Sequence, residues 1–154
     1  MRLWRICRAP FAENPLSGKG GLFASGRWHG RGRRVVYTSA TLSLAALEML
    51  AHVDRDNAPH DLVRIEIEPP DGAAVERVRR ARLPKGWHTL PAPAELKRLG
   101  NEWLDGRRTP LLEVPSSVVP EESNFLVNPE HPDVARFRVV STAPFGYDPR
   151  LVER

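Results

Sequence analysis

The chain contains a single cysteine and no long apolar run. Cys7 alone can form neither an internal disulfide nor a cysteine-based metal site, so we expect it to be a small core residue on a strand. No stretch approaches the roughly 20 apolar residues that cross a bilayer, and charges interrupt the apolar N-terminal segment, which excludes a typical secretory signal. These absences favour a cytoplasmic protein without a membrane anchor.

Aromatic residues are also scarce, at 7% of the chain, which is too few for an obvious base-stacking platform. The net charge of +4 and the isoelectric point near 9.8 would permit contact with nucleic acid. The basic residues, however, form no continuous arm and fall into separate clusters at 31–34, 77–82, 97–98 and 107–108. A phosphate-bearing small ligand or an acidic protein partner explains the surplus equally well, and we expect no direct nucleic-acid partner.

The order of helical and strand patterns predicts an α+β fold, a compact single domain over 1–154 with a strand-rich core. Strands are expected at 3–7, 35–39, 61–68, 111–114, 125–127 and 137–140, and a brief one at 26–28 within a long loop at 12–32. Thr41 can cap a helix that reaches about Val53, and Pro93 opens a second one. Thirteen of the fifteen prolines lie from Pro59 onward, which predicts short strands and turns there. Residues 143–154 are expected to be a loose tail.

Glu48 is the one carboxylate in the first of these helices. Eight apolar side chains surround it between 42 and 51, so little polar face remains for it. An ionised carboxylate is costly to bury, and such a residue is usually paired, neutralised or in use. The glycine- and arginine-rich loop just upstream suits a phosphate-bearing ligand, so acid and loop together predict a site. An outward-pointing Glu48 is the equally open alternative.

Three further candidates lie near Glu48 or in the loop. Tyr37 ends a strand just before the helix, so its ring is expected near the acid, unless it belongs to the core. Arg27 lies beside Gly26, where backbone can approach a ligand closely, or it stacks on Trp28 at the surface. Arg5 could offer its guanidinium to a phosphate, although an outward-facing strand residue is the simpler interpretation.

Polar residues in the second half are weaker candidates. Ser116 follows a proline at a strand end, where a hydroxyl often only closes a turn, and no neighbour marks it as a nucleophile. Asn124 could bind the ligand or brace the Ser116 loop, and bracing is favoured for Asn128 because Asn-Pro is a turn signal. His52 lies one helical turn after Glu48 and could orient it or cap the helix. The histidines show no metal-binding spacing, so we expect no metal, and the glycines form no dinucleotide or phosphate-loop motif.

Seven short motifs, in order along most of the chain, resemble the RES domain family, the toxin half of RES–Xre toxin–antitoxin systems. They are Leu3-Trp4-Arg5-Ile6, Leu16-Ser17-Gly18-Lys19-Gly20-Gly21, Ser25-Gly26-Arg27-Trp28-His29, Val36-Tyr37-Thr38-Ser39, Ala46-Leu47-Glu48-Met49-Leu50-Ala51-His52, Val114-Pro115-Ser116 and Asn124-Phe125-Leu126-Val127-Asn128-Pro129-Glu130-His131-Pro132.

The resemblance implies a compact fold similar to ADP-ribosyltransferase toxins and an activity that destroys NAD, which is the substrate and not a cofactor. The bond between nicotinamide and ribose would break, with water or inorganic phosphate as acceptor. It also implies an Xre-type antitoxin with a helix-turn-helix domain, and a homodimer within that complex is an associated expectation. The family's glutamate and serine correspond to Glu48 and Ser116, and its arginine to Arg5 or Arg27.

On this basis the expected catalytic set is Glu48, Arg27, Tyr37 and Ser116, and the expected NAD contacts are Arg5, Arg27, Trp28, Tyr37, Ser116 and Asn124. Two other functions remain open at this point. Transfer of ADP-ribose to a protein is the first, because the related fold permits it. A non-enzymatic nucleic-acid-binding module that uses the basic surplus is the second.

Overall fold

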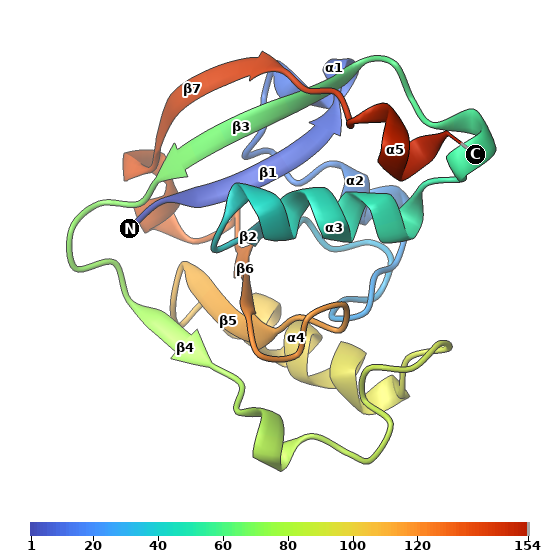
Figure 1. The fold of residues 1–154 in the computed structure, drawn as a ribbon. Helices are drawn as coiled ribbons and strands as arrows, with labels where there is room; N and C mark the ends of the chain where they lie inside the picture. Colours follow the sequence, from blue (N-terminus) through green and yellow to red (C-terminus); the bar gives the residue numbers. More distant parts are fainter. Residues whose placement is uncertain (154) are drawn as a thin grey trace.

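The computed structural model describes residues 1–153 and contains a seven-stranded sheet in the order β4-β5-β6-β2-β1-β3-β7 (Figure 1). Its neighbouring strands are antiparallel except for the parallel pair β4 and β5. The strands are β1 (Leu3–Arg8), β2 (Val36–Ser39), β3 (Leu62–Glu68), β4 (Val75–Arg77), β5 (Leu111–Pro115), β6 (Ser123–Val127) and β7 (Arg138–Pro144). The predicted α+β class with a strand-rich core is confirmed.

Two helices carry most of the helical packing. They are α3 (Leu42–His52) and α4 (Ala94–Gly106), and both begin where the sequence predicts. The Thr41 side chain accepts a hydrogen bond from the Leu44 backbone N–H at 3.1 Å and so caps α3. Short helical segments complete the fold: α1 (Ala9–Ala12), α2 (Gly20–Phe23), α5 (Pro149–Val152), η1 (Arg55–Asn57), η2 (Arg80–Arg82) and η3 (Pro132–Arg136).

The two long helices cover different halves of the sheet (Figure 1). Ala45 of α3 packs in a cluster with Ile6 of β1, next to β2. Leu96 and Trp103 of α4 lie on one face of the helix and pack with residues of β5 and β6, where both are almost fully buried. The strand β2, on which α3 packs, pairs with β6 of the half that α4 covers, so the two halves of the sheet meet at β2 and β6.

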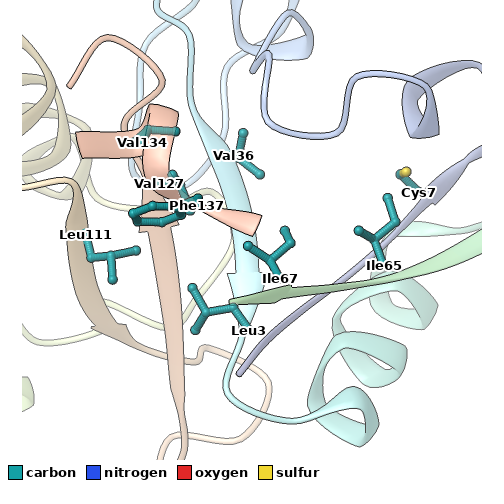
Figure 2. Close-up of a cluster of buried hydrophobic side chains, with 9 residues drawn as sticks. All are labelled: Leu3, Cys7, Val36, Ile65, Ile67, Leu111, Val127, Val134 and Phe137. Carbon is teal, nitrogen blue, oxygen red and sulfur yellow. The ribbon is translucent and has the colours of Figure 1, made fainter. Parts of the chain in front are cut away.

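A further core cluster joins both halves of the sheet (Figure 2). Ile65 and Ile67 of β3 are fully buried in it, while the charged residues that alternate with them, Arg64, Glu66 and Glu68, are only partly buried. Cys7 lies in this cluster on β1, where it was expected. Figure 2 shows Phe137 beside Val127, where η3 and the start of β7 close this end of the core.

Two local predictions are wrong. Residues 26–28 form no strand; Gly26 and His29 make an isolated β-bridge, and α2 occupies part of the predicted loop. The first part of the predicted loose tail, which was expected over 143–154, is docked: Phe145 and Tyr147 pack against the cluster under α3, and the Tyr147 hydroxyl donates to the Ala46 carbonyl, whereas Arg154 lies outside the described residues. The aromatic residues, which bury large apolar surfaces, explain the docking.

Within residues 1–153 no helix has the length and apolar character that a bilayer span requires.

Candidate functional site

Two adjoining cavities, of about 170 and 440 Å³, lie at the junction of β1, β2 and α3. They share five lining residues: Arg5, Ile6, Tyr37, Met49 and His52. Together the volumes fall within the range of about 300–1,000 Å³ typical of small-molecule sites. We call the combined space the cleft. Its smaller part is lined by Glu48 and Asn124, and its larger part by Arg27, the preceding residues 24–26 and His29.

Glu48 points from α3 into the cleft and is held by one carboxylate oxygen. Its Oε1 accepts a hydrogen bond from Ser116 Oγ at 2.7 Å and another from Asn124 Nδ2 at 2.7 Å. Both donors fall on the same oxygen, which leaves Oε2 as the oxygen available to a ligand. The alternative of an acid that simply points outward is therefore wrong, because two side chains from distant segments orient this one.

The two donors are themselves fixed by further hydrogen bonds, Ser116 in the turn after β5 and Asn124 on β6. Ser116 is fully buried, and its hydroxyl accepts from the backbone N–H groups of Val118 and Val119, at 3.1 and 2.9 Å. Ser39 Oγ donates to Asn124 Oδ1 at 2.7 Å, across the β2–β6 pair in which these two residues are in register. Since the Asn124 oxygen is occupied in this way, its amide nitrogen faces Glu48.

Ser116 does not line either cavity. Its predicted role as a hydroxyl that contacts the ligand is therefore replaced by a different one, since it orients Glu48 from behind. Asn124 does line the cleft, so the structure allows it to contact both the acid and a ligand.

Arg5 and Arg27 both line the larger cavity. Nη1 of Arg27 donates to the carbonyls of Trp87 and Thr89, at 2.8 and 2.9 Å, and Arg5 donates to the Pro15 carbonyl. Burial lowers the pKa of both guanidinium groups, and the nearby Glu48 partly opposes this at Arg27. Within residues 1–153 neither group lies within 4.0 Å of a carboxylate oxygen. Two partly desolvated cations without a paired acid favour an anionic ligand.

Tyr37 lines both parts of the cleft, near Glu48 as predicted. Its hydroxyl lies 2.7 Å from His29 Nδ1 and accepts from the Trp28 backbone N–H at 3.3 Å. Burial raises the Tyr37 pKa well above the usual range, so the phenol is neutral at physiological pH. The ring is therefore a fixed, uncharged wall of the cleft.

Trp28 is not brought to the cleft. Its side chain is 3% exposed and packs in the core with residues of α4, so only its backbone serves the site. Asn128 was expected to brace the Ser116 loop, but its Nδ2 donates instead to the Leu104 carbonyl near the end of α4. His52 Nδ1 lies 2.7 Å from the Glu48 carbonyl, which is the capping arrangement and not contact with the carboxylate.

Sequence reasoning missed His29 and Ser39, which both hold cleft residues in place. His29 directly follows the Gly-Arg-Trp segment, and Ser39 ends the strand that precedes α3. These positions are the only hints in the sequence that the two residues belong to the site, and they do not reveal which residues His29 and Ser39 bond to. The expectation that the protein binds no metal stays a prediction. In the part of the chain that is described, no three His, Cys, Asp or Glu residues are grouped so as to hold a metal ion.

Comparisons with known proteins show both the family and the fold. The RES domain profile matches residues 2–148. The toxin Res of Pseudomonas putida is 41% identical over 98% of this chain and 99% of its own, and the Prs ADP-ribosylating toxin of Sphingobium sp. is 36% identical over 98% and 96%. The solved M. tuberculosis MbcT–MbcA toxin–antitoxin complex includes a chain with the same fold, at a TM-score of 0.73 and 14% identity, over 94% of this chain and 83% of that one. The protein therefore belongs to the RES domain family.

Proposed function

We propose that this chain is the toxin of a toxin–antitoxin system and that it depletes NAD in the cytoplasm. It cleaves the N-glycosidic bond between nicotinamide and ribose, with water or inorganic phosphate as acceptor. The observation that carries the proposal is the Glu48 carboxylate, held by Oε1 alone in a cleft that also contains two guanidinium groups, neither of which has a carboxylate partner within residues 1–153. Relatives named as toxins, at up to 41% identity over nearly the whole chain, support the cellular role.

The reaction needs negative charge beside the ribose. As the glycosidic bond breaks, nicotinamide takes the bonding electrons and leaves neutral, and the ribose becomes positively charged, similar to an oxocarbenium ion. A fixed carboxylate stabilises this charge-separated transition state more than it stabilises bound NAD, and such a difference raises kcat. Glu48 provides it: Ser116 and Asn124 hold Oε1, and Oε2 stays free to face the ribose or accept from one of its hydroxyls.

The rest of the cleft matches the other parts of NAD. Arg5 and Arg27 offer planar donors to the negatively charged pyrophosphate. The Tyr37 ring supplies a flat apolar surface for nicotinamide or ribose. No step requires a metal or a cofactor to be bound first, since the positive charge that a pyrophosphate needs is already supplied by side chains.

Transfer of ADP-ribose to a protein is the second candidate. The Sphingobium relative is named as an ADP-ribosylating toxin, which favours this candidate. Both candidates break the same bond and use Glu48 in the same way, and they differ only in the group that attacks the anomeric carbon. The third option, a nucleic-acid-binding module, has less support because many basic residues are paired locally: Arg33 with Asp105, Arg77 with Glu113, and Arg108 with Glu76.

One product assay separates these candidates. Purified protein is incubated with NAD labelled in the adenosine part, with and without phosphate and with cell extract, and the products are separated by mass. Free ADP-ribose identifies water as acceptor, ADP-ribose 1″-phosphate identifies phosphate, and label on a protein band identifies transfer. We expect nicotinamide release in every case, and NAD that stays intact in all mixtures contradicts the proposal.

We also propose an antitoxin partner of the Xre type with a helix-turn-helix domain. The solved toxin–antitoxin complex with the same fold supports a partner of this kind. A cleft with two arginines suits an acidic or carboxylate-bearing segment as the blocking group. Co-expression with the neighbouring gene product should yield an inactive complex, and activity should return once the two proteins are separated. A complex that turns over NAD as fast as the free chain contradicts this.

A further inference from the structure

His29 is a buried histidine whose two ring nitrogens are both used within the protein. Its side chain lies beside the larger cavity, and the residue is 4% exposed. Nε2 lies 2.8 Å from the Ala24 carbonyl and Nδ1 lies 2.7 Å from the Tyr37 hydroxyl. A carbonyl can only accept, so Nε2 carries the proton and Nδ1 accepts from the Tyr37 hydroxyl. The neutral ring therefore has both nitrogens satisfied.

The Tyr37 hydroxyl is saturated by the same arrangement. It donates to His29 and accepts from the Trp28 backbone N–H. A protonated imidazole would present a second N–H donor to that oxygen and leave the phenolic proton without its acceptor. Burial lowers the His29 pKa most strongly; the hydrogen bond to the Ala24 carbonyl partly opposes this, and the charges of Lys97 and Arg33 add smaller lowering effects. The neutral form is the one that fits.

The same contacts hold the turn that carries Arg27. The Gly26 N–H donates to the His29 carbonyl at 3.1 Å, so residues 26–29 form a closed turn with Arg27 inside it. A side chain at Gly26 would place its Cβ 2.5 Å from the Tyr37 hydroxyl and 3.0 Å from His29 Nδ1. Glycine is required there because the turn packs directly against the two rings.

We propose that His29 is a positioning residue of the NAD-cleaving site, whose neutral imidazole locks the Tyr37 hydroxyl and so fixes both the Tyr37 ring and the Arg27 turn along the cleft. The role rests on the proposed function. His29 cannot exchange a proton with the substrate in this arrangement, because the protein occupies both of its nitrogens. It acts through the two residues that face the ligand.

Matched substitutions test which hydrogen bond matters. Asn at position 29 can place an acceptor near the position of Nδ1, whereas Leu retains neither bond. We expect His29→Asn to stay within about threefold of the wild-type kcat/KM for nicotinamide release and His29→Leu to lose about tenfold, the effect of one neutral hydrogen bond. Tyr37→Phe should lose a similar factor or more. His131→Leu, which removes a capping histidine outside the cleft, should leave kcat/KM unchanged.

The double variant distinguishes positioning from general packing. The double variant His29→Leu, Tyr37→Phe should have nearly the same kcat/KM as Tyr37→Phe alone, because without the Tyr37 hydroxyl there is no hydrogen bond for His29 Nδ1 to accept. Full additivity of the two losses overturns the proposal. So does a His29→Leu protein that turns over NAD at the wild-type rate.

A second measurement does not depend on activity. Nitrogen-15 NMR of the histidine rings should show His29 at neutral pH with the proton on Nε2, and this signature should change in Tyr37→Phe. If NAD is cleaved but the proton lies on Nδ1, this inference fails and the proposed function stands. If the signature is correct but the wild-type chain leaves NAD intact, the proposed function fails and the positioning role fails with it.

Discussion

Replacing Ser116 by alanine tests how Glu48 is held. The substitution removes a hydroxyl with three bonds: one donated to Glu48 Oε1 and two accepted from the N–H groups of Val118 and Val119. A hydrogen bond to a charged group is worth about 1.5–3 kcal/mol, which corresponds to roughly a 10- to 150-fold change. We expect kcat for nicotinamide release to fall by such a factor, because a misplaced carboxylate fails chiefly in the transition state.

The same substitution should also lower stability. Two backbone donors lose their acceptor, the fully buried Ser116 hydroxyl, so we expect a loss of about 2 kcal/mol in the free energy of unfolding. Ser123→Ala is the matched control, since Ser123 Oγ donates to Glu113 Oε1 at 2.8 Å on neighbouring strands and lines no part of the cleft. Its kcat should stay at the wild-type value.

Steady-state kinetics and urea unfolding at one temperature give both quantities. A folded Ser116→Ala protein with wild-type kcat would refute the reasoning, because Glu48 would then need no such anchor. An equal loss of kcat in Ser123→Ala would refute it too, since the effect would then come from general destabilisation.

Three further changes test the fold and its pH dependence. Gly100→Ala should lower the free energy of unfolding by about 3 kcal/mol or more, because its Cβ would lie 1.6 Å from the Trp28 carbonyl oxygen. Gly20→Ala is the control: its Cβ meets no atom within 4 Å, so urea unfolding should show a neutral or slightly stabilising effect. Tyr147→Phe should lower the free energy of unfolding by about 1 kcal/mol through loss of one hydrogen bond to α3, and no change would mean a loose tail. As the pH falls below about 6.5, wild type should lose stability relative to His29→Asn. Burial lowers the His29 pKa in the folded protein, so the unfolded chain takes up a proton at a higher pH than the folded one does. Parallel plots of unfolding free energy against pH for the two proteins would contradict this.

Local signals account for the parts of the fold that could be predicted. Thr41 before an apolar helical run and Pro93 before another mark helix starts through capping and backbone restriction, which act within one turn. The alternation of Ile65 and Ile67 with polar residues marks a half-buried strand. Each of these rules depends on neighbours in sequence, and the structure agrees with each of them.

The organisation of the site depends on contacts that sequence alone does not encode. Glu48 bonds to residues 68 and 76 positions further along the chain, and only the adjacency and register of β2 and β6 bring Asn124 and Ser39 together behind it. Trp28 was expected at the ligand because of its motif, but the core against α4 offers its ring more buried contact. The docked tail was missed because Phe145 and Tyr147 show no periodic pattern.

Nicotinamide release from NAD by wild type and Glu48→Gln tests the central claim most directly. Glutamine keeps the shape of the side chain and an oxygen for Ser116 and Asn124 but removes the negative charge. We predict a fall in kcat of about 10²–10³, typical for loss of one preorganised electrostatic group, in a protein that still binds NAD. Equal rates in the two proteins would contradict the account.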